Sequence, residues 1–302
     1  MIRPACCSLV LALLHVCSIH AETPSDKNPG RLKLAIVNPR TFTSDSWDAK
    51  VNKANIQANL DRHLAFVDQL APQGVEFIGF PELSVNGYHF SSGMTWLSLD
   101  GPEVKQLRAK ARERGVYISA GIAEQDAAGQ RWNTHFVIDP QGFIIGKHNK
   151  IELTDEEGYT RSGSTYQVFK VKGVPMGLAI CADGSEFRHL QMLVRNGARV
   201  IHAPHATRND GTTSGWYNFR SDWAGADGWI ARLKVHAFLH NHAGQYHADF
   251  KPPVANWPAG PWCSGSWIID PDGKTVARMP WSNRRSDSKE HVLIHDVPIP
   301  TR

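Results

Sequence analysis

The chain lacks any concentrated run of basic residues. Its 33 Lys and Arg against 29 Asp and Glu give a formal net charge of only +4 over 302 residues. Nucleic-acid binding favours clustered Lys and Arg with interleaved aromatic residues, and no such cluster occurs. Long apolar runs are also scarce, and the run at residues 5–19 is short for a membrane span of about 20 residues. The length and ordinary composition instead indicate a globular protein with one or two domains and a large core, without nucleic acid as a partner and without stable membrane insertion.

The N-terminus has the layout of a secretory signal peptide. Residues 1–4 carry one positive charge, residues 5–19 are mostly apolar, and Ala21 offers a small residue before the polar stretch 22–30. This pattern predicts cleavage after Ala21, a linker over 22–30, and export to the periplasm or the medium. The alternative is a retained N-terminal membrane anchor.

Cysteine is rare, with five residues in the chain. Removal of a signal peptide at 1–21 would take away Cys6, Cys7 and Cys17, so that the mature chain keeps only Cys181 and Cys263. An exported protein usually pairs its cysteines or lacks them. Two alternatives therefore remain: a single disulfide, or a free Cys181 with Cys263 as a lone buried thiol.

Two halves of the mature chain follow the same order of elements. Apolar runs and alternation predict strands at 32–38, 75–80, 116–123, 174–181, 198–204 and around 237–239, with hairpins at 134–146 and 266–273. Helical spacing predicts helices at 47–70, 102–114 and 186–196. Because the strands read as buried on both faces, we expect two sheets packed face to face with helices outside each. No boundary divides residues 31–302, so we expect one α/β domain.

Cys181 ends an apolar strand and precedes a polar turn and a predicted helix. Unpaired amides at a helix N-terminus favour an anion, which would help a thiolate form or would hold an oxyanion beside it. The alternative for Cys181 is a buried structural cysteine.

Two further residues carry candidate chemistry. Glu82 follows a buried strand, and a partly desolvated carboxylate there would have a raised pKa suited to proton transfer near neutral pH. Lys150 follows the first hairpin and offers a cation for an oxyanion. The alternatives are an exposed loop glutamate and, for Lys147 and Lys150, solvated surface charges.

Three segments together resemble the nitrilase superfamily of carbon–nitrogen hydrolases, over nearly the whole mature chain. They are Phe80-Pro81-Glu82-Leu83 with Gly87-Tyr88, Lys150-Ile151-Glu152-Leu153, and Ile180-Cys181-Ala182-Asp183 with Phe187. The separations of 68 and 31 positions between Glu82, Lys150 and Cys181 also fit. The resemblance implies a four-layer α-β-β-α sandwich, a homo-oligomer (dimer or higher), and chemistry that needs no metal or organic cofactor.

The resemblance also implies the roles of individual residues. Glu82 is the implied general base, Lys150 the oxyanion cation and Cys181 the nucleophile. The backbone N–H of Ala182 is the implied second oxyanion donor. A second glutamate of the family positions the lysine and the substrate; its spacing from Gly163 favours Glu156, with Glu157 as the fallback. Tyr88 and His205 complete the expected substrate-binding set.

The chain departs from the family pattern in places. Glu152 replaces a frequent histidine, Ser162 replaces a proline, and residues 229–233 read Trp-Ile-Ala-Arg-Leu where the family usually shows Arg-Ala-x-Glu-Asn. The last departure bears on subunit packing and on one wall of the substrate pocket.

The residues after the nucleophile, Ala182-Asp183-Gly184, are closer to aliphatic amidases than to nitrilases. We therefore expect hydrolysis of a small amide or N-carbamoyl compound, with nitrile hydrolysis as the alternative. The loops 84–96, 126–133 and 205–228 are expected to shape its pocket. Two other classes are a metal-binding protein, using His236, His240, His242 and His247, and a catalytically inactive scaffold of the same fold.

Overall fold

The computed structural model describes residues 30–42, 49–88, 94–207, 222–243, 265–279 and 290–298. The expected signal peptide and cleavage site, most of the linker, and Cys263 lie outside these residues. No helix within the described ranges is long and apolar enough to cross a membrane.

The first half builds one sheet and the two helices that cover it. Its elements are β1 (Arg31–Asn38), α1 (Ala49–Leu70), β2 (Phe77–Gly79), α2 (Pro102–Arg114), β3 (Tyr117–Gln125), β4 (Arg131–Ile138) and β5 (Ile144–Asn149). Local chemistry sets both ends of α2. Pro102 occupies the first turn, where its missing N–H costs nothing, and Gly115 ends the helix with a left-handed φ of 65°.

The second half repeats this order with shorter helices. Its elements are β6 (Val168–Val171), β7 (Val174–Leu178), the 3₁₀ helix η3 (Cys181–Ser185), α3 (Phe187–Arg195), β8 (Val200–Pro204), α5 (Trp229–Leu233), β9 (His236–His240), β10 (Trp267–Ile269), β11 (Thr275–Arg278) and β12 (His291–Pro298). The strands β6 and β12 were not among the elements predicted from the sequence.

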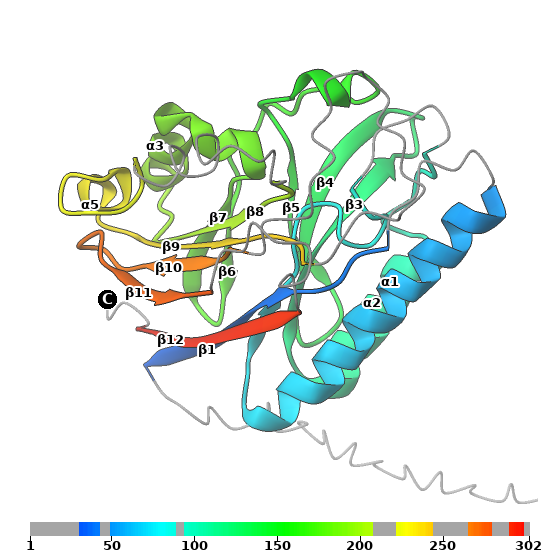
Figure 1. The fold of residues 1–302 in the computed structure, drawn as a ribbon, viewed down its shortest axis with the longest axis horizontal. Helices are drawn as coiled ribbons and strands as arrows, with labels where there is room; N and C mark the ends of the chain where they lie inside the picture. The colour runs from blue at the N-terminus through cyan, green and yellow to red at the C-terminus, as the bar shows by residue number, and fades with distance from the viewer. Residues whose placement is uncertain are drawn as a thin grey trace, which may run out of the picture.

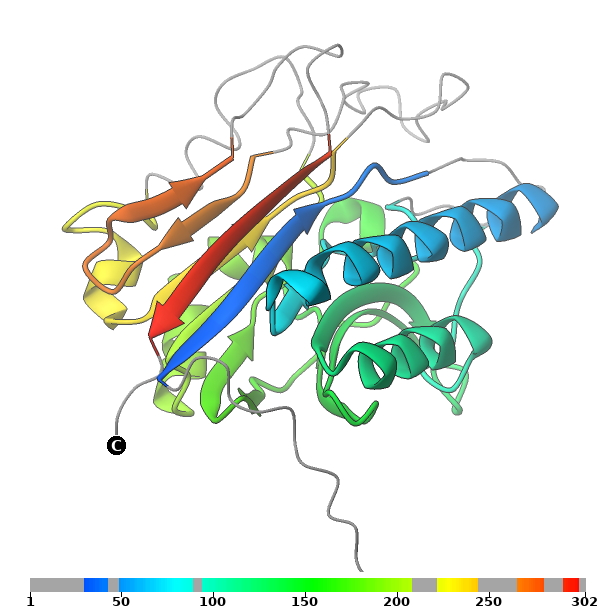
Figure 2. The ribbon, with the colours of Figure 1, turned by 90° about the horizontal axis from the view of Figure 1, so that it is seen from below.

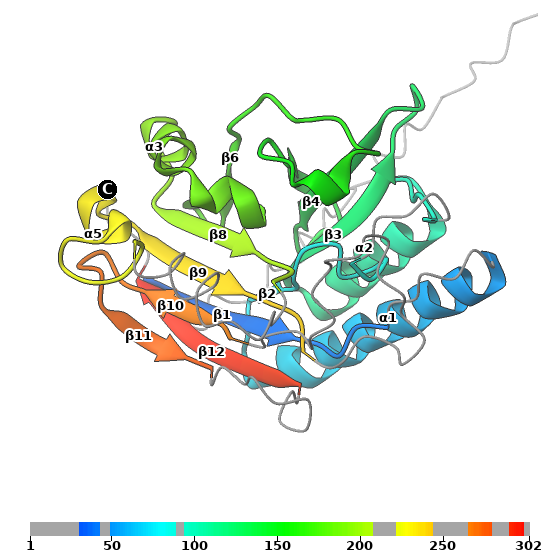
Figure 3. The same cartoon turned by 45° about the horizontal axis from the view of Figure 1, so that its top comes forward.

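The two sheets have the same topology. Their strand orders are β12-β1-β2-β3-β4-β5 and β11-β10-β9-β8-β7-β6. In each sheet three consecutive strands run parallel (β1, β2, β3 and β7, β8, β9), an antiparallel hairpin follows on one side, and one antiparallel strand closes the other edge. That edge strand is β12 beside β1 (Figure 2) and β6 beside β7, while β8, β9 and β10 lie side by side in Figure 3. The predicted pseudo-repeat is thus present in the strand order.

Three apolar clusters separate four layers. Along β1, Ala35 and Val37 pack in the cluster shared with α1 and α2, whereas Leu34 and Ile36 pack between the sheets. This alternation follows from the period of two in a strand. A third cluster joins the second sheet to α3 and α5, and Figure 1 shows these helices on the opposite side of the molecule from α1 and α2. The α-β-β-α sandwich is confirmed.

The candidate site residues follow the carboxyl ends of the parallel strands. Glu82 lies just beyond β2, Cys181 just beyond β7, and His205 just beyond β8. Because parallel strands deliver their carboxyl ends to the same edge of a sheet, this architecture brings segments distant in sequence into one crevice.

Candidate active site

A buried lysine holds two buried carboxylates together. Lys150 Nζ donates to Glu82 Oε1 at 2.9 Å and to Glu157 Oε2 at 2.6 Å, and all three side chains are fully buried. Asn133 Nδ2 donates to both carboxylates, at 2.8 Å to Glu82 and 2.6 Å to Glu157. The alternative of a solvated Lys150 is therefore wrong. Lys147 does have an outward position, with its Nζ 2.8 Å from the carboxylate of Glu124.

The second glutamate at Lys150 is Glu157. The spacing from Gly163 favoured Glu156, whose side chain lies outside the described residues. A 3₁₀ helix, η2 (Asp155–Glu157), makes the difference, because Thr154 caps it and both its backbone N–H and its hydroxyl donate to Glu157 Oε2. This capping box turns the third residue of η2 back toward Lys150. The contact expected of Glu156 is thus made by the fallback residue.

The charges in this network oppose one another. Burial raises the pKa of Glu82 to about 7; Lys150 pulls it down, and the neighbouring Glu157 pushes it up. Burial alone would lower the pKa of Lys150, but Glu82 and Glu157 outweigh it and hold the ammonium protonated. Glu82 Oε2 is buried and has no hydrogen-bond partner among the described residues. Glu82 therefore has a free oxygen and a pKa suited to proton transfer at neutral pH.

Cys181 sits on a strained turn with a free thiol. Its φ of 47° is in the left-handed region, as is the φ of 48° at Leu83, directly after Glu82. Such conformations cost about 1–3 kcal/mol in a non-glycine residue and cluster at functional sites. The residue is partly exposed, yet the protein around it raises the pKa of the thiol by burial and by the charge of Glu82, while Lys150 and the backbone N–H of Ala206 oppose the rise.

The turn after Cys181 is itself helical. The sequence predicted a polar turn between Cys181 and a helix over 186–196. The turn is the five-residue η3, and α3 begins at Phe187. The amide of Asp183 is already used by the carbonyl of Ile180 at 3.0 Å. Cys181 is the first residue of this tight turn, followed by Ala182, which is half-buried.

Asp183 joins the nucleophile turn to the lysine segment. Its Oδ1 accepts the backbone N–H groups of Ile151 at 2.9 Å and Glu152 at 2.8 Å. Its Oδ2 accepts the N–H of Ile180 at 2.9 Å and His148 Nε2 at 2.8 Å. These are charge-assisted bonds from a fully buried carboxylate, so they fix the segment after Lys150 against the strand end before Cys181.

The remaining predicted residues are buried close to these segments. Tyr88 packs in a small cluster with Leu83 and Ala206, and His205 directs its Nδ1 to the carbonyl of Ala203 at 2.8 Å. From the sequence, His242 was considered only as a metal ligand, but its Nε2 lies 2.6 Å from the carbonyl oxygen of Glu82. Its place just after β9 is the signal that could have suggested this contact.

Among the described residues, the histidines considered as a metal cluster do not converge. His236 and His240 are the two ends of strand β9, not neighbours on a helix, and four strand residues span about 13 Å. His240 Nε2 contacts His202 Nε2 in the core, His242 contacts Glu82, and His247 lies outside the described residues. The i, i+4 pairing considered for His236 and His240 is therefore wrong, because it required a helix and the structure has a strand.

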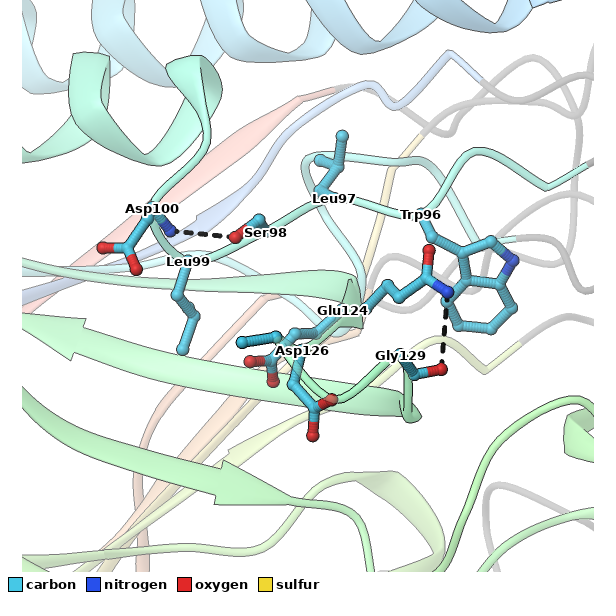
Figure 4. A pocket seen from close by; sticks show the side chains of 10 residues that line it. Trp96, Leu97, Ser98, Leu99, Asp100, Glu124, Asp126 and Gly129 are labelled. Carbon is cyan, nitrogen blue, oxygen red and sulfur yellow. Dashed lines mark hydrogen bonds between the residues drawn. The ribbon is translucent and has the colours of Figure 1, made fainter.

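A surface pocket of about 500 Å³ lies beside the end of β3 (Figure 4). It is lined by residues 96–100 and by several residues of 124–129, and none of the three catalytic candidates lines it. Glu124, which lines the pocket, bonds to Thr134. Because strand residues alternate, Thr134 points to the opposite face of β4 from Asn133, which contacts Glu82. Glu124 therefore lies on the face of the first sheet that is turned away from the catalytic candidates.

Trp223, an aromatic residue of the predicted pocket loops, is fully buried, and its indole N–H donates to the carbonyl of Gly184.

The sandwich, with a buried Glu-Lys-Glu network beside a free cysteine at its strand ends, defines a protein of the carbon–nitrogen hydrolase class. The family model described as carbon-nitrogen hydrolase matches residues 33–301. The chain belongs to this family, and the resemblance to the nitrilase superfamily is confirmed.

Curated relatives match part of the chain. The omega-amidase NIT2 of Mus musculus is 28% identical over 163 residues, which cover 49% of this chain and 58% of the mouse protein. A protein named nitrilase from Pyrococcus abyssi is 31% identical over 182 residues, or 57% of this chain and 64% of that protein. The chain thus matches these relatives over less than two thirds of their length.

Solved structures confirm the fold over a longer range. An amidase from a Nesterenkonia species matches with a TM-score of 0.70 at 19% identity, covering 88% of this chain and 90% of that one. A variant of that amidase, with a TM-score of 0.71 and 18% identity over 90% and 92% of the two chains, holds the acetamide moiety of fluoroacetamide added covalently at its active-site cysteine.

Proposed function

We propose that this protein is a thiol hydrolase that cleaves the non-peptide C–N bond of a small amide or N-carbamoyl compound. The observation that carries the proposal is the buried network in which Lys150 bonds to Glu82 beside the free thiol of Cys181, with the pKa of Glu82 raised to about 7. In the related amidase the active-site cysteine carries the acetamide moiety of fluoroacetamide, which supports a nucleophilic cysteine in an amidase of this fold.

In the first half of the reaction Cys181 attacks the carbonyl carbon. Because burial raises the pKa of this thiol, it carries its proton at rest and needs a base during attack. Glu82 Oε2, buried and without a partner among the described residues, takes that proton. Lys150 and the backbone N–H of Ala182 hold the negative charge that develops on the carbonyl oxygen.

The second half returns the enzyme to its starting state. Protonated Glu82 gives its proton to the nitrogen, the C–N bond breaks, and ammonia or an amine leaves behind a thioester. Glu82 then takes a proton from water, which attacks the thioester carbon. Collapse of that intermediate releases the acid and restores the thiol with a proton from Glu82. A group that acts alternately as base and acid needs a pKa near the working pH, as Glu82 has.

Nitrile hydrolysis is the second candidate, because a protein named nitrilase is among the relatives. The turn sequence Ala182-Asp183-Gly184 favours the amide. A nitrile substrate would use the same thiol attack, so the two candidates differ in substrate and not in the residues at work.

An ammonia-release screen over amides, N-carbamoyl amino acids and nitriles tests the proposal. We expect Cys181→Ala to abolish turnover of the best substrate while the protein stays folded. Lys150→Ala should lower kcat by about 100-fold or more, because it removes a buried cation from the oxyanion site. Lys147→Ala, three positions away and paired with Glu124 toward the surface, is the matched control and should keep near-normal activity. Retained turnover in Cys181→Ala would contradict the mechanism.

We also propose that the protein is exported, on the signal-peptide layout of residues 1–21 alone. The intact mass of the protein recovered from the periplasm or medium should correspond to a chain that begins near Glu22. Recovery of the full-length chain in the membrane fraction would favour the N-terminal anchor.

A further inference from the structure

Three metal-ligating side chains meet behind the nucleophile turn. His148 comes from β5, Asp183 from η3 and His189 from α3, and all three are buried. One ligand atom from each lies within 4.8 Å of the other two. The rings of His148 and His189 meet edge to face, with centroids 5.4 Å apart.

The hydrogen bonds of His189 leave a lone pair facing a carboxylate. Its Nε2 lies 3.3 Å from the carbonyl oxygen of Leu178, which can only accept, so this nitrogen carries the proton of the neutral ring. The other nitrogen, Nδ1, then has a lone pair. It lies 3.8 Å from Asp183 Oδ1 and has no hydrogen-bond partner among the described residues.

Two buried acceptors that face each other repel unless a cation stands between them. A proton would satisfy the geometry, but it would create an imidazolium in a site that is 2% exposed. A divalent metal ion would satisfy it with both rings neutral. It would also draw on a third ligand, His148, which already contacts the same carboxylate.

The ligand separations suit a small divalent ion. Zinc bonds of about 2.0–2.1 Å in tetrahedral geometry separate neighbouring ligand atoms by about 3.3 Å. Asp183 Oδ2 lies 2.8 Å from His148 Nε2, and Asp183 Oδ1 lies 3.8 Å from His189 Nδ1. For an ion that binds both carboxylate oxygens, these separations lie on either side of that value. To bind the ion, His148 moves its ring proton from Nε2 to Nδ1, so the ring stays neutral. Backbone amides of Ile151, Glu152 and Ile180 already hold the carboxylate in place.

We propose that His148 Nε2, His189 Nδ1 and the Asp183 carboxylate form a structural site for one divalent transition-metal ion of the zinc type. Two imidazoles and one carboxylate are the donors that such ions prefer. The ion joins β5, the nucleophile turn and α3, and so strengthens the connection that Asp183 makes between the Lys150 and Cys181 segments. Its role is to position these segments, and it touches no reacting atom.

Metal titration of the full exported chain tests this site. The Cys181→Ala variant is used so that the nucleophile thiol cannot bind the ion, and the protein is first dialysed against a chelator. Calorimetric titration with Zn²⁺ should show one equivalent bound, and Co²⁺ should give visible absorption bands from nitrogen ligation. Adding His148→Gln or His189→Gln should weaken Zn²⁺ binding by more than about 100-fold, beyond the usual effect of an outer partner. Adding His236→Gln, a half-buried histidine of β9, should leave it unchanged.

Two results would overturn the proposal. One is the absence of saturable Zn²⁺ binding and of Co²⁺ bands in the folded Cys181→Ala protein, which requires no further variant. The other is equal binding in all three histidine variants, which would indicate adventitious binding elsewhere. Because the readout is metal binding and not turnover, failure of this proposal and failure of the proposed hydrolase activity are distinguishable.

Discussion

The pKa of Glu82 sets how the activity should depend on pH. The carboxylate must be ionised to take the proton of Cys181, and burial raises its pKa to about 7. Below that value the ionised fraction falls tenfold per pH unit, so kcat/KM at pH 5 should be about one hundredth of its plateau value. An ordinary exposed glutamate, with a pKa of about 4.3, would leave the activity at pH 5 nearly intact.

Glu157→Gln changes this profile in a direction that the structure determines. Glu157 is a second negative charge beside Glu82 and raises the pKa of Glu82. Its replacement by an uncharged side chain of the same shape leaves Lys150 and Asn133 to stabilise the Glu82 carboxylate without an opposing negative charge. The acidic limb of kcat/KM should therefore move to lower pH. The matched control is Glu124→Gln, which also removes a buried carboxylate paired with a lysine, but on the opposite face of the sheet.

The assay is kcat/KM for the best amide from pH 5 to 9 in the wild type and both variants. Samples held at each pH are returned to pH 7.5 and assayed again, which separates titration of Glu82 from acid unfolding. A limb near pH 4 in the wild type would refute the argument, because it would mean that burial does not govern Glu82. An unshifted limb in Glu157→Gln, or an equal shift in Glu124→Gln, would refute the role of the neighbouring charge.

Two further predictions concern stability. His63 is buried with a pKa lowered by burial to about 4, whereas an exposed histidine has about 6.5. As the pH falls between these values the unfolded chain binds a proton that the folded chain does not, so stability is lost, by about 2 kcal/mol at pH 5. Urea unfolding at pH 8 and pH 5 should therefore show that His63→Gln loses about 2 kcal/mol less than the wild type on acidification; parallel losses would count against it. Asp183→Asn should lower the free energy of unfolding by at least about 2 kcal/mol, because the amide nitrogen faces backbone N–H donors. Asp126→Asn, in a surface turn with similar backbone bonds, should cost less, and an equal loss in the two variants would contradict the importance of burial at Asp183.

Local sequence chemistry determined most of the elements. The helix α2 has the predicted bounds because Pro102 and Gly115 act within one turn of its ends. The strand β12 escaped prediction because its partner, β1, lies at the other end of the chain. The strand β6 was also missed, although its partner β7 follows it directly in a tight hairpin. For β12 the register pairs Arg31 with Pro298 across nearly the whole chain. The eight residues of β12 do not by themselves indicate a partner so far away in the sequence.

The residue types of the site and their order along the chain could likewise be read from the sequence. Glu82, Lys150 and Cys181 each follow a predicted strand or hairpin, and the structure buries the first two in direct contact. What only the tertiary structure decided is which groups surround them. Glu157, the fallback residue, bonds to Lys150 because a capped 3₁₀ turn directs it there. The raised pKa of Glu82 arises from burial and from the charges of Lys150 and Glu157, which only the folded chain brings beside it. The bonds from Asp183 to residues 148–152 join the two halves of the chain and form only when the two sheets pack. Burial and charge depend on neighbours in space and not in sequence.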